Sequence, residues 1–148
     1  MSAHPTMAFR LIGRIFVIVH TEDAPSAEDF QALLTFIRND FTLADRRCLV
    51  VTPGPAPSAK QREAMNNALR EKGLQSSTVA IVTPSAVARG AVTALSWFNR
   101  NIRSFPPQEM HKALEYLEML PQESAEVGIE VRKMQAQLTA RRRIGPAS

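Results

Sequence analysis

The sequence predicts an α/β domain in which helices pack against a mixed β-sheet, and three observations lead to that fold class. Short apolar, β-branched segments alternate with longer segments whose apolar residues recur at helical spacing. Their order, ββαβαβαβα, implies parallel strand pairs connected by crossover helices. The chain has 148 residues, of which 45% are hydrophobic, so it is long enough for one domain with a substantial core.

The chain begins with a predicted β-hairpin. Residues 8–12 and Ile15–His20 are rich in apolar and β-branched side chains, and Gly13 and Arg14 between them fit a tight turn. Residues 15–19 read IFVIV without polar alternation, so we expect this second strand to be covered on both faces.

A helix is predicted after the hairpin. Ser26 and Asp29 have the spacing of a capping box, with Asp29 in place of the usual glutamate. The apolar residues that follow recur at helical spacing and form one face of the helix: Phe30, Leu33, Leu34, Ile37 and Phe41.

The next strand, loop and helix form the segment around which we expect a functional site to be built. The strand is Arg47–Val51, the proline-rich turn covers residues 52–57, and a helix opens at Ser58 and stops at Gly73. Ser58 and Gln61 have capping-box spacing. A strand that leads into a helix through a short loop leaves backbone N–H groups and the positive end of the helix at the sheet edge. Many α/β proteins place their binding residues there.

Two further strand–helix pairs complete the predicted domain. Residues 77–82 form a buried strand, and a helix follows with one apolar face made of Ala88, Ala91, Val92, Leu95 and Phe98. Ile102–Phe105 form a short strand, and Pro106 and Pro107 start a helix that Pro121 is expected to end.

The last part of the chain is predicted to form one more helix, residues 123–143. Val127, Val131, Met134 and Leu138 make a narrow apolar seam along it. Such a seam suits docking on the domain, or pairing with the same helix of a second chain, which would make a homodimer. We therefore divide the chain into a single α/β domain, residues 7–120, and a C-terminal helical extension with a basic tail, residues 121–148.

Charge and cysteine content narrow the classes of partner and compartment. The net charge is +4, but three consecutive arginines at 141–143 nearly supply it, so the basicity is local and nucleic acid is not an expected partner. The single cysteine rules out an intramolecular disulfide and suits a reducing cytoplasm. The apolar run at residues 15–19 is far too short to span a bilayer.

The order of elements resembles the STAS domain, the fold of the bacterial anti-sigma-factor antagonists. The landmarks are the opening hairpin, the strand CLVV before its loop, the helix QREAMNNALREKG, the strand TVAIV running into TPSAVARGAVTAL, and the final IRSFPPQEMHKALEYL. The similarity covers roughly residues 7–120 and is one of pattern rather than signature. It implies a single STAS-like domain that acts in cytoplasmic signalling as a regulatory module.

The resemblance also draws attention to the loop before Ser58. In the antagonists, the loop after the third strand carries an Asp-Ser-Ser/Thr-Gly-type motif whose hydroxyl is phosphorylated by the partner kinase. Here that loop reads TPGPAPS, without the Asp and the trailing Gly, so the chain resembles a more distant STAS-like relative. Two interpretations of Ser58 follow: a helix cap that contributes about 1 kcal/mol, and a phosphoacceptor whose added charge suits the helix end.

The function that we favour from the sequence is a non-enzymatic, regulatory protein–protein interaction module. Its predicted partner-binding surface comprises the loop and the exposed side of the following helix: Thr52, Ser58, Lys60, Gln61 and Arg62. Lys60 and Arg62 beside the helix start favour an acidic or phosphorylated partner. The alternative is a small-ligand carrier or an enzyme that uses the C-terminal edge of the sheet.

The sequence shows no constellation of catalytic or metal-binding residues. Cys48 and His20 lie in strands that could be neighbours and are the one conceivable nucleophile–base pair, but no third, orienting group accompanies them. The three histidines, His4, His20 and His111, lack metal-ligand spacing. Residues 53–55 lack the glycine spacing and the lysine of a phosphate-binding loop. We therefore predict neither a metal nor a cofactor.

Overall fold

The computed structural model describes residues 5–39, 47–55, 57–74, 77–96 and 101–144. It contains a five-stranded sheet with the strand order β1-β2-β3-β4-β5. The strands β1 and β2 form the predicted antiparallel hairpin, and each later strand pairs in parallel with the one before it. The strands are β1 (Met7–Ile12), β2 (Ile15–His20), β3 (Arg47–Val51), β4 (Thr78–Val82) and β5 (Ile102–Phe105). The predicted α/β class and the ββαβαβαβα order are confirmed.

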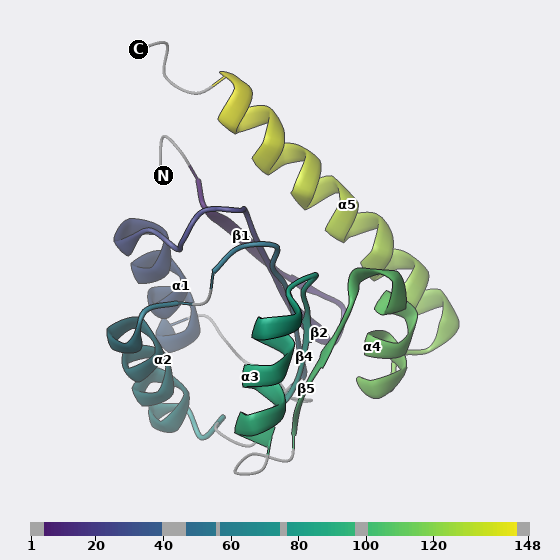
Figure 1. Cartoon of the computed structure of the whole chain (residues 1–148), viewed down its shortest axis with the longest axis horizontal. Helices are drawn as coiled ribbons and strands as arrows, with labels where there is room; N and C mark the ends of the chain where they lie inside the picture. The colour runs from purple at the N-terminus through teal and green to yellow at the C-terminus, as the bar shows by residue number, and fades with distance from the viewer. Residues whose placement is uncertain (1–4, 40–46, 56, 75–76, 97–100, 145–148) are drawn as a thin grey trace.

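Helices cover both faces of the sheet (Figure 1). Because the parallel strands follow one another in sequence order, right-handed crossovers place their three connecting helices on one face. The last two helices lie on the opposite face (Figure 1). The helices are α1 (Ala27–Asn39), α2 (Ala59–Glu71), α3 (Ala86–Ser96), α4 (Met110–Tyr116), which follows the 3-10 turn η1 (Pro107–Glu109), and α5 (Pro121–Ile144).

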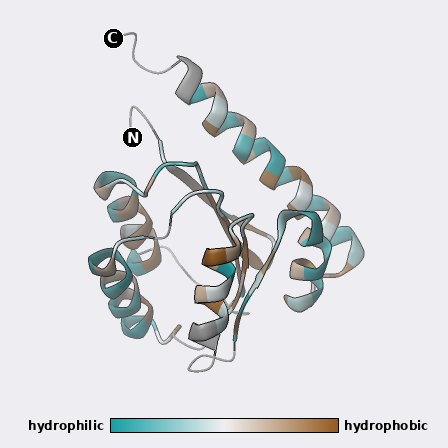
Figure 2. Ribbon diagram, viewed as in Figure 1, coloured by the Kyte–Doolittle hydropathy of each residue, from teal (hydrophilic) through white to brown (hydrophobic). Residues whose placement is uncertain are grey.

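Strand β2 separates two apolar clusters, one on each face of the sheet. Ile15, Val17 and Val19 belong to the cluster under α4 and α5. Phe16 and Ile18 belong to the cluster under α1 and α2. All five side chains are buried, which confirms the prediction from the IFVIV run that both faces are covered. In Figure 2 the strands are mostly brown, whereas α2 is mostly teal, because α2 contributes few apolar side chains to the core.

The C-terminal helix docks on the domain through the predicted seam. Val127, Val131, Met134 and Leu138 are all buried in the same cluster as the sheet residues of β2 and β3. Of the two roles expected for the seam, docking within the chain is therefore the one observed. Pairing of two chains through these same side chains would require α5 to leave the sheet.

No helix in the described part of the chain is long and apolar enough to cross a membrane.

The boundary between α4 and α5 differs from the prediction. The helix α4 ends at Tyr116 without any help from Pro121, because Glu118 adopts a left-handed conformation with φ 59°. The Glu118 N–H then donates to the Glu115 carbonyl at 2.9 Å, and the Met119 N–H donates to the Leu114 carbonyl at 3.0 Å. Pro121 is the first residue of α5, a position where its missing N–H is no loss. The predictions that Pro121 ends the earlier helix and that the last helix begins at residue 123 were wrong.

The start of α1 shows half of the predicted capping box. The Asp29 N–H donates to Ser26 Oγ at 3.0 Å, as expected. The Asp29 carboxylate, however, accepts hydrogen bonds from the backbone N–H and the hydroxyl of Thr6, at 2.7 and 2.8 Å. Asp29 therefore fastens the segment before β1 to α1. Two residues expected on helix faces, Phe41 and Phe98, lie outside the described residues.

Candidate functional site

The loop between β3 and α2 leads into a fully formed capping box. The Gln61 N–H donates to Ser58 Oγ at 3.1 Å, and the Ser58 N–H donates to Gln61 Oε1 at 3.0 Å. The predicted box is confirmed, and so is the capping role of Ser58. At the other end of α2, Gly73 has φ 68° and its N–H donates to the Arg70 carbonyl at 3.1 Å, which ends the helix as expected.

This loop is fastened to the neighbouring loop between β2 and α1. The Gln61 side chain donates from Nε2 to the Pro25 carbonyl at 3.1 Å. At Gly54, a Cβ atom would lie only 2.6 Å from the Thr21 carbonyl oxygen and 2.8 Å from that of Glu22. Only glycine permits the two backbones to approach so closely, so the two loops behave as one unit. No local sequence pattern indicates this contact, since it depends on a second loop that is distant in sequence.

The five residues predicted to bind a partner divide into exposed and structural positions. Ser58, Lys60 and Arg62 are exposed, whereas Thr52 and Gln61 are half-buried. The Thr52 N–H donates to the Val82 carbonyl at 2.9 Å, and Gln61 makes the bonds described above. The Arg62 guanidinium donates to the Pro57 carbonyl at 2.7 Å and thereby steadies the loop. Lys60 makes no ion pair with any residue in the described part of the chain.

A pocket of about 450 Å³ lies at the same edge of the sheet, where β2 and β3 end. Its walls come from the end of β2 and the residues after it, from the β3–α2 loop, and from the C-terminal half of α5. The lining residues are His20, Thr21, Glu22, Pro53, Gln135, Leu138 and Thr139. The C-terminal edge of the sheet, which we named as the alternative location of a functional site, thus carries a pocket.

The pairing of β2 with β3 separates Cys48 from His20. Cys48 pairs with Phe16, and His20 lies four residues farther along β2, a separation of about 13 Å along the strand. Burial also raises the pKa of the Cys48 thiol to about 12 and lowers the pKa of His20 to about 4. At neutral pH neither group carries a charge, and the thiol is not a nucleophile. A Cys48–His20 dyad is excluded, and the described residues contain no cluster able to hold a metal ion.

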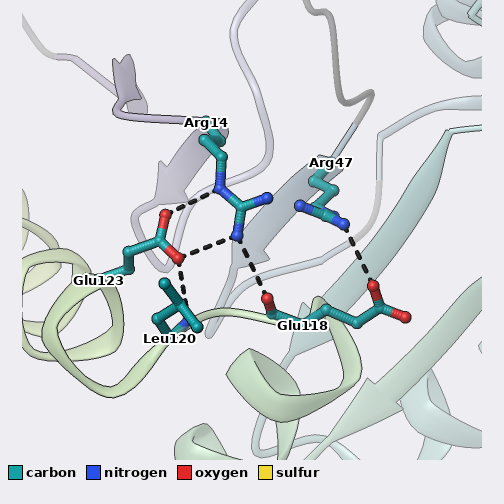
Figure 3. A network of polar contacts seen from close by, with 5 residues as sticks. All are labelled: Arg14, Arg47, Glu118, Leu120 and Glu123. Carbon is teal, nitrogen blue, oxygen red and sulfur yellow. Dashed lines mark hydrogen bonds and ion pairs between the residues drawn. The ribbon is translucent and has the colours of Figure 1, made fainter.

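At the opposite edge of the sheet, where β2 and β3 begin, Arg14 and Glu123 form a bidentate ion pair (Figure 3). The Arg14 Nε and Nη2 groups donate to the two carboxylate oxygens at 2.8 and 2.9 Å. The Leu120 N–H also donates to Glu123 at 2.9 Å, so Glu123 caps α5 as well. The hydrogen bond from Arg14, followed by that from Leu120, lowers the pKa of Glu123 to about 2. Beside this pair, Arg47 contacts Glu118 at 3.2 Å (Figure 3).

Comparisons of the chain with family models, with curated proteins and with solved structures find no match. The resemblance to the STAS family therefore stays a prediction from the sequence pattern.

Proposed function

We propose that the protein is a non-enzymatic regulatory module that binds a protein partner through the start of α2. The α2 entry surface consists of Thr52, Ser58, Lys60, Gln61 and Arg62. The observation that carries the proposal is the contrast within this set: Ser58, Lys60 and Arg62 are exposed, while Gln61 and the neighbouring Gly54 fasten the loop beneath them. A surface held in place before binding loses little conformational entropy when a partner arrives.

The charge of this surface favours an acidic or phosphorylated partner. The first turn of α2 contains no acidic residue, and Lys60 and Arg62 lie beside the positive end of the helix. The α2 entry surface thus attracts anions through two side chains and the helix end together. This complementarity would act mainly on the association rate and on the choice of partner.

The STAS-like pattern supports a second element of the proposal, the regulation of this surface at Ser58. The Ser58 hydroxyl is exposed, and it caps α2 by accepting the Gln61 N–H. Phosphate oxygens accept hydrogen bonds as well as a hydroxyl does, so phosphorylation at a helix start is compatible with the cap. Phosphorylation would add negative charge beside Lys60 and Arg62 and would weaken binding of an acidic partner.

The test is a charge reversal at the α2 entry surface. Lys60→Glu combined with Arg62→Glu should abolish the capture of partners from lysate of the native host, because both attractive charges become repulsive. The melting temperature should fall only slightly, since both side chains are exposed and the bond from Arg62 to the Pro57 carbonyl that is lost lies at the surface. The matched control is Arg132→Glu with Lys133→Glu, which changes the net charge equally at exposed positions of α5. Equal capture by wild type and by the α2 double variant would refute the proposal.

A further inference from the structure

The pocket lies at the C-terminal edge of the sheet, where β2 and β3 end, which we call the carboxyl edge. It has the size and position of a small-molecule site. Its volume of about 450 Å³ falls within the range of ligand pockets, about 300–1,000 Å³. It lies beyond the carboxyl ends of β2 and β3, where open α/β sheets bind ligands. Part of its wall is apolar, because Leu138 and Pro53 line it between the polar residues.

Three polar side chains of the pocket wall are exposed to solvent, whereas two glutamates of α5 are bound in ion pairs. In the described part of the chain, the side chains of Glu22, Gln135 and Thr139 have no hydrogen-bond or ion-pair partner. By contrast, Glu123 and Glu130 of the same helix are bound to Arg14 and Arg10, at 2.8 and 2.6 Å. The pocket therefore presents one carboxylate, one amide and one hydroxyl that are available to a ligand.

The described residues of the pocket wall are acidic in character within a positively charged protein. The chain has a net charge of +4, yet Glu22 is the one acidic residue, and no basic one accompanies it except His20, among the described residues that line the pocket. His20 stays neutral at neutral pH, because burial lowers its pKa to about 4. Among the residues whose side chains the structure describes, no lysine or arginine lines the pocket. This balance selects against anions and favours a group that donates hydrogen bonds and carries positive charge.

We propose that this pocket binds a small organic amine. The ammonium group pairs with the Glu22 carboxylate and donates to the oxygens of Gln135 or Thr139. The apolar part of the amine packs on Leu138 and Pro53. Met134 and Leu138 of α5 are buried against the sheet and hold this wall in position, so the site exists before the ligand arrives.

The site goes beyond the proposed partner binding and shares with that surface only the loop of residues 52–58, to which Pro53 belongs. The substitutions that test the pocket differ from those that test partner binding, since Lys60 and Arg62 do not line the pocket. A Lys60→Glu, Arg62→Glu variant should therefore still bind the amine, and a Glu22→Gln variant should still capture partners. Failure of one proposal leaves the other standing.

The experiment is an NMR titration of the full chain, labelled with ¹⁵N, with three probes of the same shape: cyclohexanemethylamine, cyclohexanemethanol and cyclohexanecarboxylate. The amine should give saturable shifts at the amides of Thr21, Glu22, Gln135 and Thr139, with a dissociation constant of about 1–10 mM, ordinary for so small a probe. The alcohol and the carboxylate should bind at least about tenfold more weakly, because they lack the charge-assisted bond.

Two variants test the role of the carboxylate. Glu22→Gln keeps the size of the side chain and should weaken amine binding about tenfold. Glu126→Gln removes the same charge from an exposed position of α5 outside the pocket and should leave binding unchanged. The proposal is overturned if none of the probes gives saturable shifts at the pocket amides, if the carboxylate binds as well as the amine, or if the two variants behave alike.

Discussion

The two edges of the sheet differ in how some of their charged side chains are paired. At the edge where β2 and β3 begin, Arg14 and Glu123 are paired with each other through two hydrogen bonds. At the edge where the same strands end, Glu22 and Lys60 have no ion-pair partner in the described part of the chain. Polar groups satisfied within the chain contribute to stability, whereas those left without partners are available for binding. We therefore propose that the amino edge, where β2 and β3 begin, stabilises the fold and that the carboxyl edge, where they end, serves recognition.

Removal of α5 should have the largest effect on the free energy of unfolding, because this helix runs from one edge of the sheet to the other. Truncation after Leu120 deletes four buried side chains, Val127, Val131, Met134 and Leu138, each worth about 1.5–3 kcal/mol. That loss is comparable with the whole stability of a small domain, about 5–15 kcal/mol, so cooperative melting should disappear or shift far downwards. Differential scanning calorimetry is the measurement, with truncation after Arg141 as the control that keeps the seam. An unchanged melting temperature would mean that α5 does not stabilise the domain. A fall in the mass in solution from dimer to monomer would show that α5 pairs two chains instead.

Acid should weaken the carboxyl edge before the amino edge. As the pH falls from 6.5 to about 4, the unfolded chain takes up a proton at His20 that the folded chain does not. Stability is therefore full above pH 6.5 and declines by up to roughly 3 kcal/mol towards pH 4. The pKa of Glu123 is lowered from 4.5 to about 2, so the stabilisation from its ion pair is lost as the pH falls from 4.5 towards 2, after most of the loss at His20.

Urea unfolding at pH 7 and pH 4.5 separates these contributions. His20→Gln removes the titrating imidazole and should flatten the dependence between the two pH values, while Glu123→Gln should not. If wild type and His20→Gln lose the same stability over this interval, His20 is not the group that titrates.

Substitution of Gly54 should loosen the carboxyl edge alone. Gly54→Ala places a Cβ atom 2.6 Å from the Thr21 carbonyl oxygen, so one of the two loops must move, which costs about 1–3 kcal/mol. The control is Gly90→Ala in α3, where nothing lies within 4 Å of the added atom. That change should stabilise the helix by about 0.5–1 kcal/mol. Thermal melting of both variants is the measurement, and equal effects of the same sign would show that the loops are not in close contact.

The smallest expected effect lies at the amino edge, at Glu118. This residue has φ 59°, which glycine adopts without strain, and its own side chain, which pairs with the mostly buried Arg47, is largely exposed to solvent. Glu118→Gly should therefore raise the free energy of unfolding by a few tenths to about 1 kcal/mol. Chemical denaturation detects such a change, and a clear loss of stability would show that the Arg47–Glu118 pair contributes more than the backbone strain removes.

The sequence predicted the elements whose signals are local. Apolar periodicity was sufficient for the strands, the helices and the seam of α5, and the Ser58–Gln61 box was read correctly because both partners lie within one turn. Asp29 was assigned only half correctly, since its carboxylate binds Thr6, which lies 23 residues earlier in the chain. Pro121 was misread because a proline fits both after the end of one helix and at the start of the next.

The features of the site that the sequence did not reveal depend on contacts between distant segments. Arg14 and Glu123 are 109 residues apart, and no local pattern connects them. The role of Gly54 depends on the carbonyl groups of another loop, and the pocket has walls from three separate parts of the chain. The exposed residues Ser58, Lys60 and Arg62 were predicted because their exposure follows from the pattern of one helix.

The most direct test of the division between the two edges is amide hydrogen exchange of the full chain, measured alone and with a partner captured by wild type. Recognition at the carboxyl edge predicts slower exchange at the β3–α2 loop and the first turns of α2, residues 52–62. Exchange at the amino edge, residues 13–15 and 118–124, should stay unchanged. Protection by the partner that appears at the amino edge and spares residues 52–62 would contradict the account.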